Sequence, residues 1–358
     1  MSKFHKIKVK KINRETNDCV SLSLDVPDEL KETFRYKHGQ YLTFKRMENG
    51  EELRRSYSLC SSPNDGEWKV AIKKVPDGKF STYANATLTI GDELEVMPPA
   101  GRFFTELNKD NQKNYLAFAA GSGITPVLSI IKTILYTEPK SAVTLIYGNK
   151  GRNSIIFKEE LEALKNKYVQ RLSVHHILSR EHGDTEILFG RIDKEKTRFI
   201  LDKIIDAAQI DDCFICGPEE MVHAVTDTLV AANVNRKKIH SELFTTAESR
   251  KVIHKKIKNN EGEHDRKSKV TIKLDGITRL MEMSYYGDTI LDAAMANGSE
   301  LPYSCKNGMC STCRAKVTKG KVEMDVNYSL EPDEVAAGYI LTCQARPLSD
   351  EVVVDFDV

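Results

Sequence analysis

Four cysteines near the C-terminus have the spacing of metal ligands. Three lie close together and the fourth lies well downstream, in the order Cys305-x4-Cys310-x2-Cys313-x29-Cys343. This is one of the known spacings of a [2Fe–2S] site, and four thiolates are the soft, anionic ligands that such a site requires. Gly308 is small and flexible, so the loop can bring backbone N–H groups close to the sulfurs.

A four-cysteine zinc site is the alternative for these residues. Zinc ligands usually come as two short Cys-x2–4-Cys pairs, whereas Cys343 is isolated. The other four cysteines, at positions 19, 60, 213 and 216, are scattered, and a large cytosolic chain is not expected to form disulfides. The spacing therefore favours iron–sulfur over zinc.

Two motifs in the N-terminal third could hold a flavin. An iron–sulfur site carries single electrons, so a flavin is needed if a hydride donor feeds it. Arg55-Ser56-Tyr57-Ser58 lies on a predicted strand, where Arg can pair with a phosphate and Tyr can lie flat on a ring system. Gly78-Lys79-Phe80-Ser81-Thr82 opens a predicted short helix with free N–H groups. Each motif alone is a weak signal, and an Arg–Tyr pair on a strand is more often an ordinary surface pair.

Two glycine motifs follow predicted strands further along the chain. Gly121-Ser122-Gly123-Ile124-Thr125-Pro126 joins a strand to a helix, which is the setting of a phosphate-binding turn, although Pro126 replaces the third glycine of the dinucleotide fingerprint. Cys216-Gly217-Pro218 ends the last predicted strand before a helix. A buried cysteine at a strand end is the plain alternative for Cys216.

The coenzyme preference is predicted from the residues that follow two strands. An acid after the second strand would hold a ribose 2′-hydroxyl, whereas an arginine would bind a 2′-phosphate. Here Asn149, Lys150 and Arg152 follow the second strand, and Ser179-Arg180 follows the third. These residues favour NADPH over NADH, with solvated basic side chains as the alternative.

Three regions with different sequence rhythms position these motifs. Residues 1–106 are predicted to form an antiparallel β-barrel, because short alternating segments are separated by Gly, Pro, Asn and Asp. Residues 107–247 alternate strands with helices, which predicts an α/β domain with a parallel sheet. Residues 248–269 are polar and indicate a linker. Residues 270–358 form a compact α+β unit, with a hairpin expected about Gly276.

The predicted elements can be given by their bounds. The barrel strands are Cys19–Val26, Tyr41–Arg46, Arg55–Cys60, Trp68–Val75 and Glu93–Met97. The α/β strands are Tyr115–Ala120, Val143–Gly148, Leu172–Leu178 and Cys213–Cys216, with helices ending near Leu135 and spanning Ile156–Tyr168, Lys194–Ala208 and Glu219–Asn233. The last unit has strands Val270–Leu274, Leu280–Ser284, Arg314–Thr318 and Val352–Phe356, and the helix Thr289–Ala296.

Composition excludes several function classes. The chain has 358 residues with 53 Lys and Arg against 52 Asp and Glu, so its charge of +1 makes no case for nucleic acid as a partner. The most apolar stretch, Tyr115–Tyr136, is interrupted by glycines, a proline and Lys132, so no membrane insertion is expected. Met1–Lys11 lacks the apolar core of a signal peptide, and we expect a cytoplasmic protein. Residues 270–358 hold eight basic and fourteen acidic residues, a net charge of −6.

The order of the motifs resembles the ferredoxin–NADP reductase superfamily over residues 1–245, followed by a plant-type ferredoxin domain of β-grasp fold over residues 270–358. The Cys loop and Leu341-Thr342-Cys343 carry the second resemblance, which implies that the four cysteines bind a [2Fe–2S] cluster. The first implies that Arg55 and Ser81 hold the FAD pyrophosphate within the Gly78–Thr82 turn, that Tyr57 stacks on the flavin and that Ser58 lies near its N5. His38-Gly39-Gln40-Tyr41 also fits the flavin-barrel pattern.

The same resemblance implies roles for the remaining motif residues. The nicotinamide nucleotide would be received by Gly121, Gly123, Thr125 and Pro126, and its 2′-phosphate by Ser179 and Arg180. Cys216, Gly217 and Pro218 would lie beside the nicotinamide ring, with Cys216 as a positioning group rather than a nucleophile. Glu242 and Phe244 would lie at the flavin face. Ser58, Cys216 and Glu242 are thus the candidate catalytic residues.

The domain order resembles the reductase components of bacterial multicomponent oxygenases. That resemblance implies electron flow from NADPH through FAD and a [2Fe–2S] cluster to an oxygenase or other electron-accepting protein, with a carboxylate-bridged di-iron oxygenase of the phenylacetyl-CoA epoxidase type as the expected partner. Phthalate-type reductases share the order but hold FMN, and the Gly78-x-x-Ser81 turn favours FAD. A fatty-acid desaturase, a hydroxylase or a hybrid-cluster protein is an alternative acceptor. A zinc-stabilised binding or sensing module without redox turnover is the alternative of another class.

Overall fold

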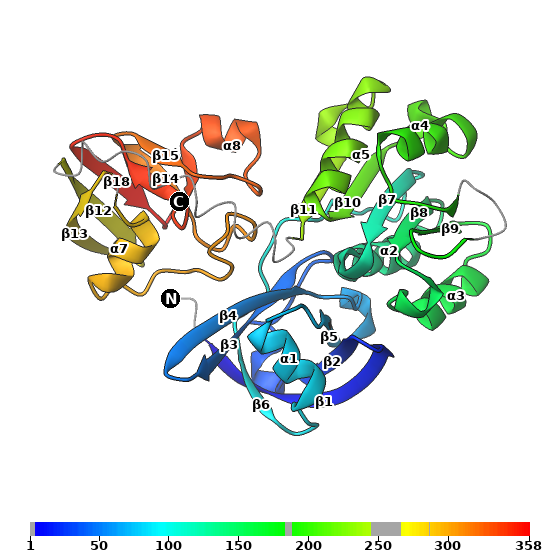
Figure 1. Ribbon diagram of the computed structural model, residues 1–358, viewed down its shortest axis with the longest axis horizontal. Coiled ribbons are helices and arrows are strands. Elements are labelled where there is room, and N and C mark those ends of the chain that lie inside the picture. Colours follow the sequence, from blue (N-terminus) through cyan, green and yellow to red (C-terminus); the bar gives the residue numbers. More distant parts are fainter. Residues whose placement is uncertain (1–3, 183–187, 245–265, 286) are drawn as a thin grey trace. The chain divides into compact units, whose positions relative to one another are not determined.

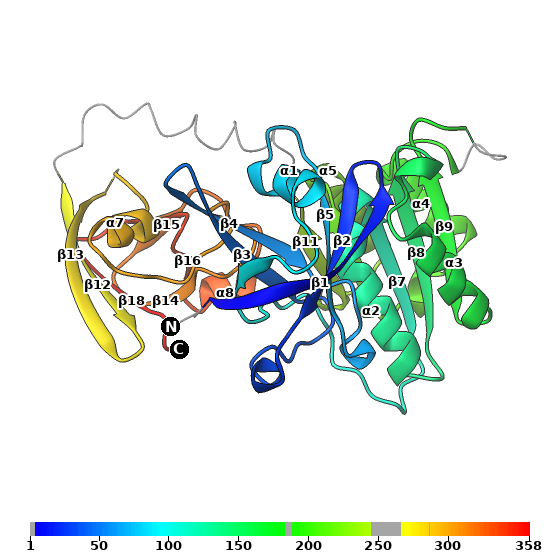
Figure 2. The same ribbon diagram turned by 90° about the horizontal axis from the view of Figure 1, so that it is seen from below.

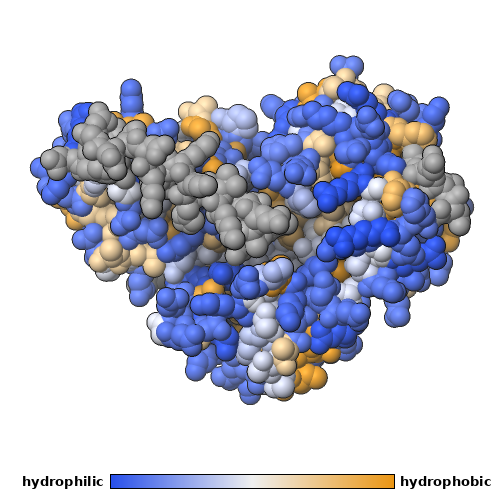
Figure 3. Space-filling model, in the orientation of Figure 1, coloured by the Kyte–Doolittle hydropathy of each residue, from blue (hydrophilic) through white to orange (hydrophobic). Residues whose placement is uncertain are grey.

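The computed structural model describes residues 4–182, 188–244, 266–285 and 287–358. The chain divides into two compact units, Phe4–Thr245 and Thr246–Val358, and each is described by itself. Within the described residues, no helix has the length and apolar character needed to cross a membrane. Apolar side chains are scattered in small areas on the face shown in Figure 3.

The first half of the larger unit is an antiparallel barrel. Its sheet has the strand order β4-β3-β6-β1-β2-β5, and an isolated bridge between Leu59 and Val70 links the two ends of that order. Helix α1 (Lys79–Ala86) lies beside β5 (Figure 1). The strands are β1 (His5–Thr16), β2 (Cys19–Asp25), β3 (Tyr41–Glu48), β4 (Glu51–Ser58), β5 (Trp68–Lys73) and β6 (Glu93–Val96).

The predicted barrel is confirmed, but β1 is missing from the predicted strands. Ile7 and Val9 of β1 are buried and alternate with lysines, and the high lysine content hides this alternation in the sequence. The barrel core contains Phe44 of β3, Phe80 of α1 and Phe34 of the segment between β2 and β3, all of them buried.

The second half of the larger unit is a parallel sheet with the strand order β11-β10-β7-β8-β9. Helices α4 and α5 cover one side of it and α2 and α3 the other (Figure 1). The strands are β7 (Asn114–Ala120), β8 (Ala142–Asn149), β9 (Leu172–Leu178), β10 (Asp212–Gly217) and β11 (Ile239–Leu243). The helices are α2 (Ile124–Thr137), α3 (Lys158–Lys167), α4 (Lys194–Lys203) and α5 (Glu219–Ala231). The chain winds in opposite directions from β7, so a topological switch point lies between β7 and β10.

Three predictions in this sheet differ from the structure. The predicted helix from Ile156 begins only at Lys158, because Phe157 has a φ of 60°. The helix predicted to reach Ala208 ends at Lys203, and Asp206 caps a separate 3-10 turn by accepting a hydrogen bond from the Ala208 N–H. Strand β11 is absent from the predicted elements, and it pairs in parallel with β10.

The smaller unit has a mixed sheet with the order β13-β12-β18-β14-β16, in which only β12 and β18 pair in parallel. In Figure 2 the twisted β12–β13 hairpin curves around α7. The strands are β12 (Lys267–Leu274), β13 (Ile277–Ser284), β14 (Arg314–Lys319), β16 (Tyr339–Leu341) and β18 (Glu351–Asp355), with the small pair β15 (Val322–Met324) and β17 (Ala345–Pro347) and the helices α7 (Ile290–Ala296) and α8 (Pro332–Ala336).

The predicted hairpin about Gly276 is confirmed, with Asp275 and Gly276 both at positive φ, as a tight two-residue turn requires. Strand β12 begins at Lys267, so residues 267–269 of the predicted linker are strand residues. The predicted linker up to residue 265 lies outside the described residues. The unit has its own apolar core.

The barrel and the parallel sheet share an apolar core. Cys19, Cys60 and Ala71 of the barrel pack in one cluster with Ile124 and Val127 of α2 and with residues of β7 and β8. This continuous packing explains why residues 4–244 form one unit. It also holds the flavin motifs and the nucleotide motifs in one rigid frame.

Candidate functional site

The four cysteines of the smaller unit are brought together in two pairs. Cys305, Cys310 and Cys313 lie on the loop between α7 and β14, and Cys343 follows β16. The Cys310 thiol donates to Cys305, and the Cys313 thiol donates to Cys343. Among the described residues, no three His, Cys, Asp or Glu side chains are grouped around a single metal-ion position. Two adjacent thiol pairs fit the two irons of a [2Fe–2S] cluster.

The loop presents hydrogen-bond donors to the sulfurs. The Asn307 N–H lies 3.3 Å from Cys305 Sγ, and Thr312 Oγ1 lies 3.2 Å from Cys310 Sγ. Lys306, Gly308 and Ser311 have φ values of 53°, 72° and 52°, and these turns fold the loop tightly. The hydrogen bond from Cys310 lowers the pKa of Cys305 to about 6, despite burial, with help from backbone N–H groups. Within each pair, one sulfur, that of Cys305 or Cys343, is therefore the more readily ionised.

Strand β4 carries the predicted flavin residues at the end of the sheet. The Tyr57 ring packs against Phe44 and Phe80, with ring centroids 5.9 and 5.6 Å apart. Ser58 is buried, and Arg55 Nη1 donates to the Arg54 carbonyl at 2.6 Å. Side chains alternate along a strand, so Arg55 and Tyr57 lie on one face of the sheet and Ser56 and Ser58 on the other.

The turn before α1 is built around Gly78. A Cβ at this position would lie 2.4 Å from Ser81 Oγ and 2.4 Å from a methyl group of Val75. The Ser81 hydroxyl accepts from the Val75 N–H and donates to the Gly78 carbonyl, so it braces the turn. A cavity of about 380 Å³ opens beside this turn, and Thr82 is among its lining residues. The first N–H groups of α1 are thus the anion-binding groups that the turn offers.

The two glycine motifs meet at the switch point. Ala119 of β7 pairs with Cys216 of β10, and the chain turns sharply after each. A Cβ on Gly123 would lie 2.1 Å from the Cys216 carbonyl oxygen, so only glycine permits this approach. Tyr147 Oη donates to the Gly121 carbonyl at 3.0 Å. The Gly121–Gly123 turn leads directly into the N-terminus of α2, which is the setting that a phosphate-binding turn requires.

Two more predicted residues of this motif lie in the first turn of α2. Thr125 is buried, and its Oγ1 donates to the Ser122 carbonyl at 3.0 Å. Pro126 is buried beside it, at a position where a missing N–H does no harm. Pro218 directly precedes α5. Both prolines thus lie at the N-terminal end of a helix, where the loss of an N–H breaks no helical hydrogen bond.

Strand β11 brings Glu242 and Phe244 to the second glycine motif. Glu242 pairs with Cys216, and the Phe244 N–H donates to the Gly217 carbonyl at 3.0 Å. Glu242 Oε2 is shielded from solvent and has no hydrogen-bond partner, and burial raises its pKa to about 8. Burial, and the nearby Glu242, also raise the pKa of Cys216 well above its usual range, so Cys216 stays a thiol. An unpartnered carboxyl oxygen here fits a polar ligand.

Ser179 and Arg180 lie where β8 and β9 end side by side. Their N–H groups donate to the carbonyls of Asn149 and Lys150 at 2.9 and 2.8 Å. Arg180 is exposed, and the buried Asn149 Nδ2 has no hydrogen-bond partner. These groups fit the ribose end of a nucleotide.

Glu181, an acid that contacts the loop after β8, is not among the site residues predicted from the sequence. Glu181 accepts from the Arg152 N–H at 2.8 Å and pairs with Arg152 Nε at 3.1 Å. It comes from the end of β9, whereas the acid of the usual fingerprint follows the second strand. Only the parallel pairing of β8 and β9 reveals that Glu181 reaches the loop after β8.

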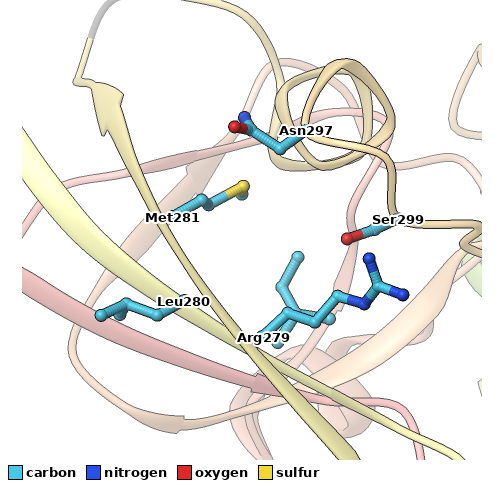
Figure 4. A pocket seen from close by; sticks show the side chains of 6 residues that line it. Arg279, Leu280, Met281, Asn297 and Ser299 are labelled. Atoms are coloured by element: carbon cyan, nitrogen blue, oxygen red, sulfur yellow. The ribbon is translucent and has the colours of Figure 1, made fainter.

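A further cavity of about 280 Å³ lies in the smaller unit, away from the cysteine loop. Figure 4 shows it between β13 and the end of α7, with the Arg279 guanidinium turned toward Ser299. Arg279 Nη1 donates to the Gly298 carbonyl at 3.0 Å. None of the predicted site residues lines this cavity.

Comparisons with known proteins cover all three regions. Three family models match: an oxidoreductase FAD-binding domain over residues 6–105, an oxidoreductase NAD-binding domain over residues 118–227 and a 2Fe-2S iron-sulfur cluster binding domain over residues 272–348. Together they confirm the predicted fold classes and favour the redox interpretation over the zinc-stabilised binding module.

Full-length relatives share this order of domains. The chain is 46% identical over 357 residues to a component of 1,2-phenylacetyl-CoA epoxidase from Escherichia coli (strain K12), covering 100% of this chain and 99% of that protein. It is 35% identical to the ferredoxin reductase component of 3-ketosteroid-9-alpha-monooxygenase from Rhodococcus rhodochrous, covering 97% and 95%. The structure of phthalate dioxygenase reductase is similar in fold, with a TM-score of 0.59 and 22% identity over 99% of this chain and 98% of that one. The chain belongs to the family of NAD(P)H-dependent reductase components of oxygenase systems, which join FAD-binding, NAD-binding and 2Fe-2S domains.

Proposed function

We propose that this protein takes electrons from NADPH and delivers them to a di-iron oxygenase of the phenylacetyl-CoA epoxidase type. The observation that carries the proposal is the 46% identity to a component of that epoxidase, because the identity extends through every domain of both chains. The proposed domains are residues 1–106 for FAD, 107–247 for the nicotinamide nucleotide and 270–358 for the cluster, with residues 248–269 as linker. We place the protein in the cytoplasm.

The chain's own residues would bind and orient the cofactors. Arg55 and the N-terminal N–H groups of α1 would hold the FAD pyrophosphate, and the Ser81 hydroxyl would keep their turn in shape. Tyr57 would support the flavin ring, and Ser58 would lie at its reactive edge. FAD, when bound, can accept a hydride and release single electrons, which a [2Fe–2S] cluster carries onward.

The nucleotide end of the site would be formed at the switch point. Gly121 and Gly123 allow the nucleotide to approach the backbone, and Cys216 and Glu242 lie next to each other on β10 and β11. A protonated Glu242 could donate a hydrogen bond or move a proton, because burial keeps its pKa near neutrality. The four cysteines would ligate the cluster, with Cys305 and Cys310 on one iron and Cys313 and Cys343 on the other.

The experiment that tests the proposal is an anaerobic titration of the purified protein followed by visible absorption. We expect combined flavin and iron–sulfur absorption that NADPH bleaches, and then transfer of electrons to a purified oxygenase of the phenylacetyl-CoA epoxidase type. Bleaching without transfer to that oxygenase, but with transfer to a desaturase, hydroxylase or hybrid-cluster protein, would reassign the partner. A colourless, zinc-containing protein would overturn the redox function altogether.

The preference for NADPH predicts a selective effect of Arg180→Ala. A charge-assisted bond to the 2′-phosphate contributes about 1.5–3 kcal/mol, so the KM for NADPH should rise roughly ten- to a hundredfold. The KM for NADH, which has no 2′-phosphate, should change little. Steady-state reduction of ferricyanide with each coenzyme measures both values. Arg198→Ala, which removes an exposed arginine on α4, is the control. An equal rise in the KM for both coenzymes would mean that the 2′-phosphate binds elsewhere.

A further inference from the structure

Helix α2 and the segment that follows β4 are joined by buried polar contacts. The segment after Ser58 is Leu59-Cys60-Ser61-Ser62, and each of these four residues is at most 1% exposed. The contacts come from three residues of α2, Ser129, Lys132 and Thr133. Their spacing places all three on one face of the helix. This polar face is unusual in a helix with eleven buried residues, most of them apolar.

The hydrogen bonds across this contact are short and well shielded. Ser129 Oγ donates to the Ser61 carbonyl at 2.6 Å. The Thr133 hydroxyl donates to the Ser129 carbonyl at 2.6 Å, so it must accept from Ser62 Oγ, which lies 3.0 Å away. Ser129 is 0% exposed and Thr133 is 6% exposed. Breaking one of these bonds would leave a buried polar group without a hydrogen-bond partner, which is costly. The bonds therefore favour a single position of α2 relative to residues 61 and 62.

A network of charges surrounds these hydrogen bonds. Lys132 Nζ lies 2.6 Å from Asp65 of the barrel and 2.8 Å from Glu160 of α3. Lys69 of β5 lies 3.0 Å from the same Glu160. Burial alone would raise the pKa of Glu160, but Lys69 and Lys132 hold it below its usual range. The network therefore keeps its charges, and it links the barrel to two helices of the parallel sheet.

We propose that Ser129, Lys132 and Thr133 are positioning residues for hydride transfer; this inference rests on the proposed function. The contact, which we call the α2 latch, comprises these residues with Ser61, Ser62 and Asp65. Ser58 is proposed to lie at the reactive edge of the flavin, and Ser61 lies three residues beyond it. Ser129 lies six residues beyond Gly123, a rise of about 9 Å along the helix. The latch thus joins the flavin strand to the nicotinamide turn by a short, stiff path.

The rate of hydride transfer depends steeply on the distance and angle between the nicotinamide and the flavin. A misplacement of about 1 Å between reacting groups can cost on the order of a hundredfold in rate. The shared apolar core brings the barrel and sheet together, but apolar packing is not directional. Directional hydrogen bonds can set the final distance and angle. Removing them should therefore slow the chemical step more than it weakens the binding of either cofactor.

The test is the double variant Ser129→Ala/Thr133→Val in the full-length flavoprotein. Stopped-flow reduction of FAD by NADPH should be roughly ten- to a hundredfold slower, with a larger isotope effect from C4-deuterated NADPH and little change in nucleotide Kd. Thr228→Val is the matched control, because Thr228 is also buried and also donates to the carbonyl four residues back, but on α5. Thr133→Ser keeps the hydroxyl and should behave as wild type.

Hydrogen–deuterium exchange supplies a readout that does not depend on redox activity. The double variant should exchange faster at residues 59–66 and 129–137, whereas Thr228→Val should not. A variant with faster exchange but an unchanged rate of flavin reduction would overturn the positioning role and leave a structural one. Unchanged exchange at residues 59–66 would overturn the latch itself. A wild-type protein whose flavin is reduced by neither coenzyme would instead refute the proposed function, and the exchange data would still decide the latch.

Discussion

Cys310→Ser is expected to abolish electron delivery to a protein acceptor and to leave ferricyanide reduction by the flavin near the wild-type rate. Cys310 is paired with Cys305 and accepts a hydrogen bond from Thr312. A serine hydroxyl is a harder and far less acidic ligand than a thiol, so one iron would lose half of its protein ligands. The cluster would be lost or would no longer carry electrons. The measurements are iron content, visible absorption and reduction of the partner oxygenase.

Flavin activity should survive because the two units have separate cores. The cluster loop packs in the core of the smaller unit, which contains Cys313 and Cys343, and no residue of the barrel belongs to it. Cys19→Ala is the control for loss of a buried thiol, since Cys19 lies in the barrel and far from the cluster loop in sequence. Loss of both activities in Cys310→Ser would mean that cluster binding is required for folding of the whole chain.

The cluster loop and the glycine motifs were predictable because their chemistry is local. Three of the four cysteines lie within nine residues, and the glycines permit turns whose sterics are set by neighbouring residues. The fourth cysteine follows from the fixed spacing of this class of site. The mixed sheet of the smaller unit was harder to predict, because β15, β16 and β17 have only three residues each. Such short strands show no alternation that a sequence pattern can detect.

The features that were not predicted from the sequence act across strands or domains. Glu181 reaches the loop after β8 only because β8 and β9 pair in parallel. The environment of Glu242 depends on β11, a strand absent from the predicted elements. The α2 latch joins residues that are 67 to 71 positions apart in the sequence. Its one sequence signal is the helical spacing of Ser129, Lys132 and Thr133 in an otherwise apolar helix. Such a polar stripe is normally interpreted as the solvent-exposed face of the helix.

The role of Ser81 in holding the FAD pyrophosphate stays a prediction, and the structure shows a second role for its hydroxyl. Its hydroxyl type and position suggested a direct bond to phosphate, yet its Oγ is engaged by the Val75 N–H and the Gly78 carbonyl. A serine that braces a turn and a serine that binds a ligand have the same sequence signature. The local fold of residues 75–81, in which the Val75 N–H reaches the Ser81 hydroxyl, shows the bracing contact. The backbone of α1 therefore becomes the better candidate for the phosphate contact.

Gly123→Ala should reduce the rate of flavin reduction by NADPH on the order of a hundredfold while leaving FAD bound. Gly123 has a φ of −61°, which any residue can adopt, so the cost is purely steric. The new Cβ would lie 2.1 Å from the Cys216 carbonyl oxygen, 2.6 Å from its carbon and 3.0 Å from the Gly217 nitrogen. These are backbone atoms of a central strand, so they cannot rotate away as a side chain could.

The clash must move either the phosphate-binding turn or the Cys216–Gly217 segment. Overpacking of this kind costs about 1–3 kcal/mol in stability, which the shared core can tolerate. Gly148→Ala is the matched control on the same sheet, because the closest atom to its Cβ would be a methyl carbon of the Ile192 side chain, at 3.1 Å. Stopped-flow reduction and FAD content measure the two effects. If both variants reduced the flavin equally fast, the close approach of Gly123 to Cys216 would serve packing alone, and the nicotinamide would have to bind away from this turn.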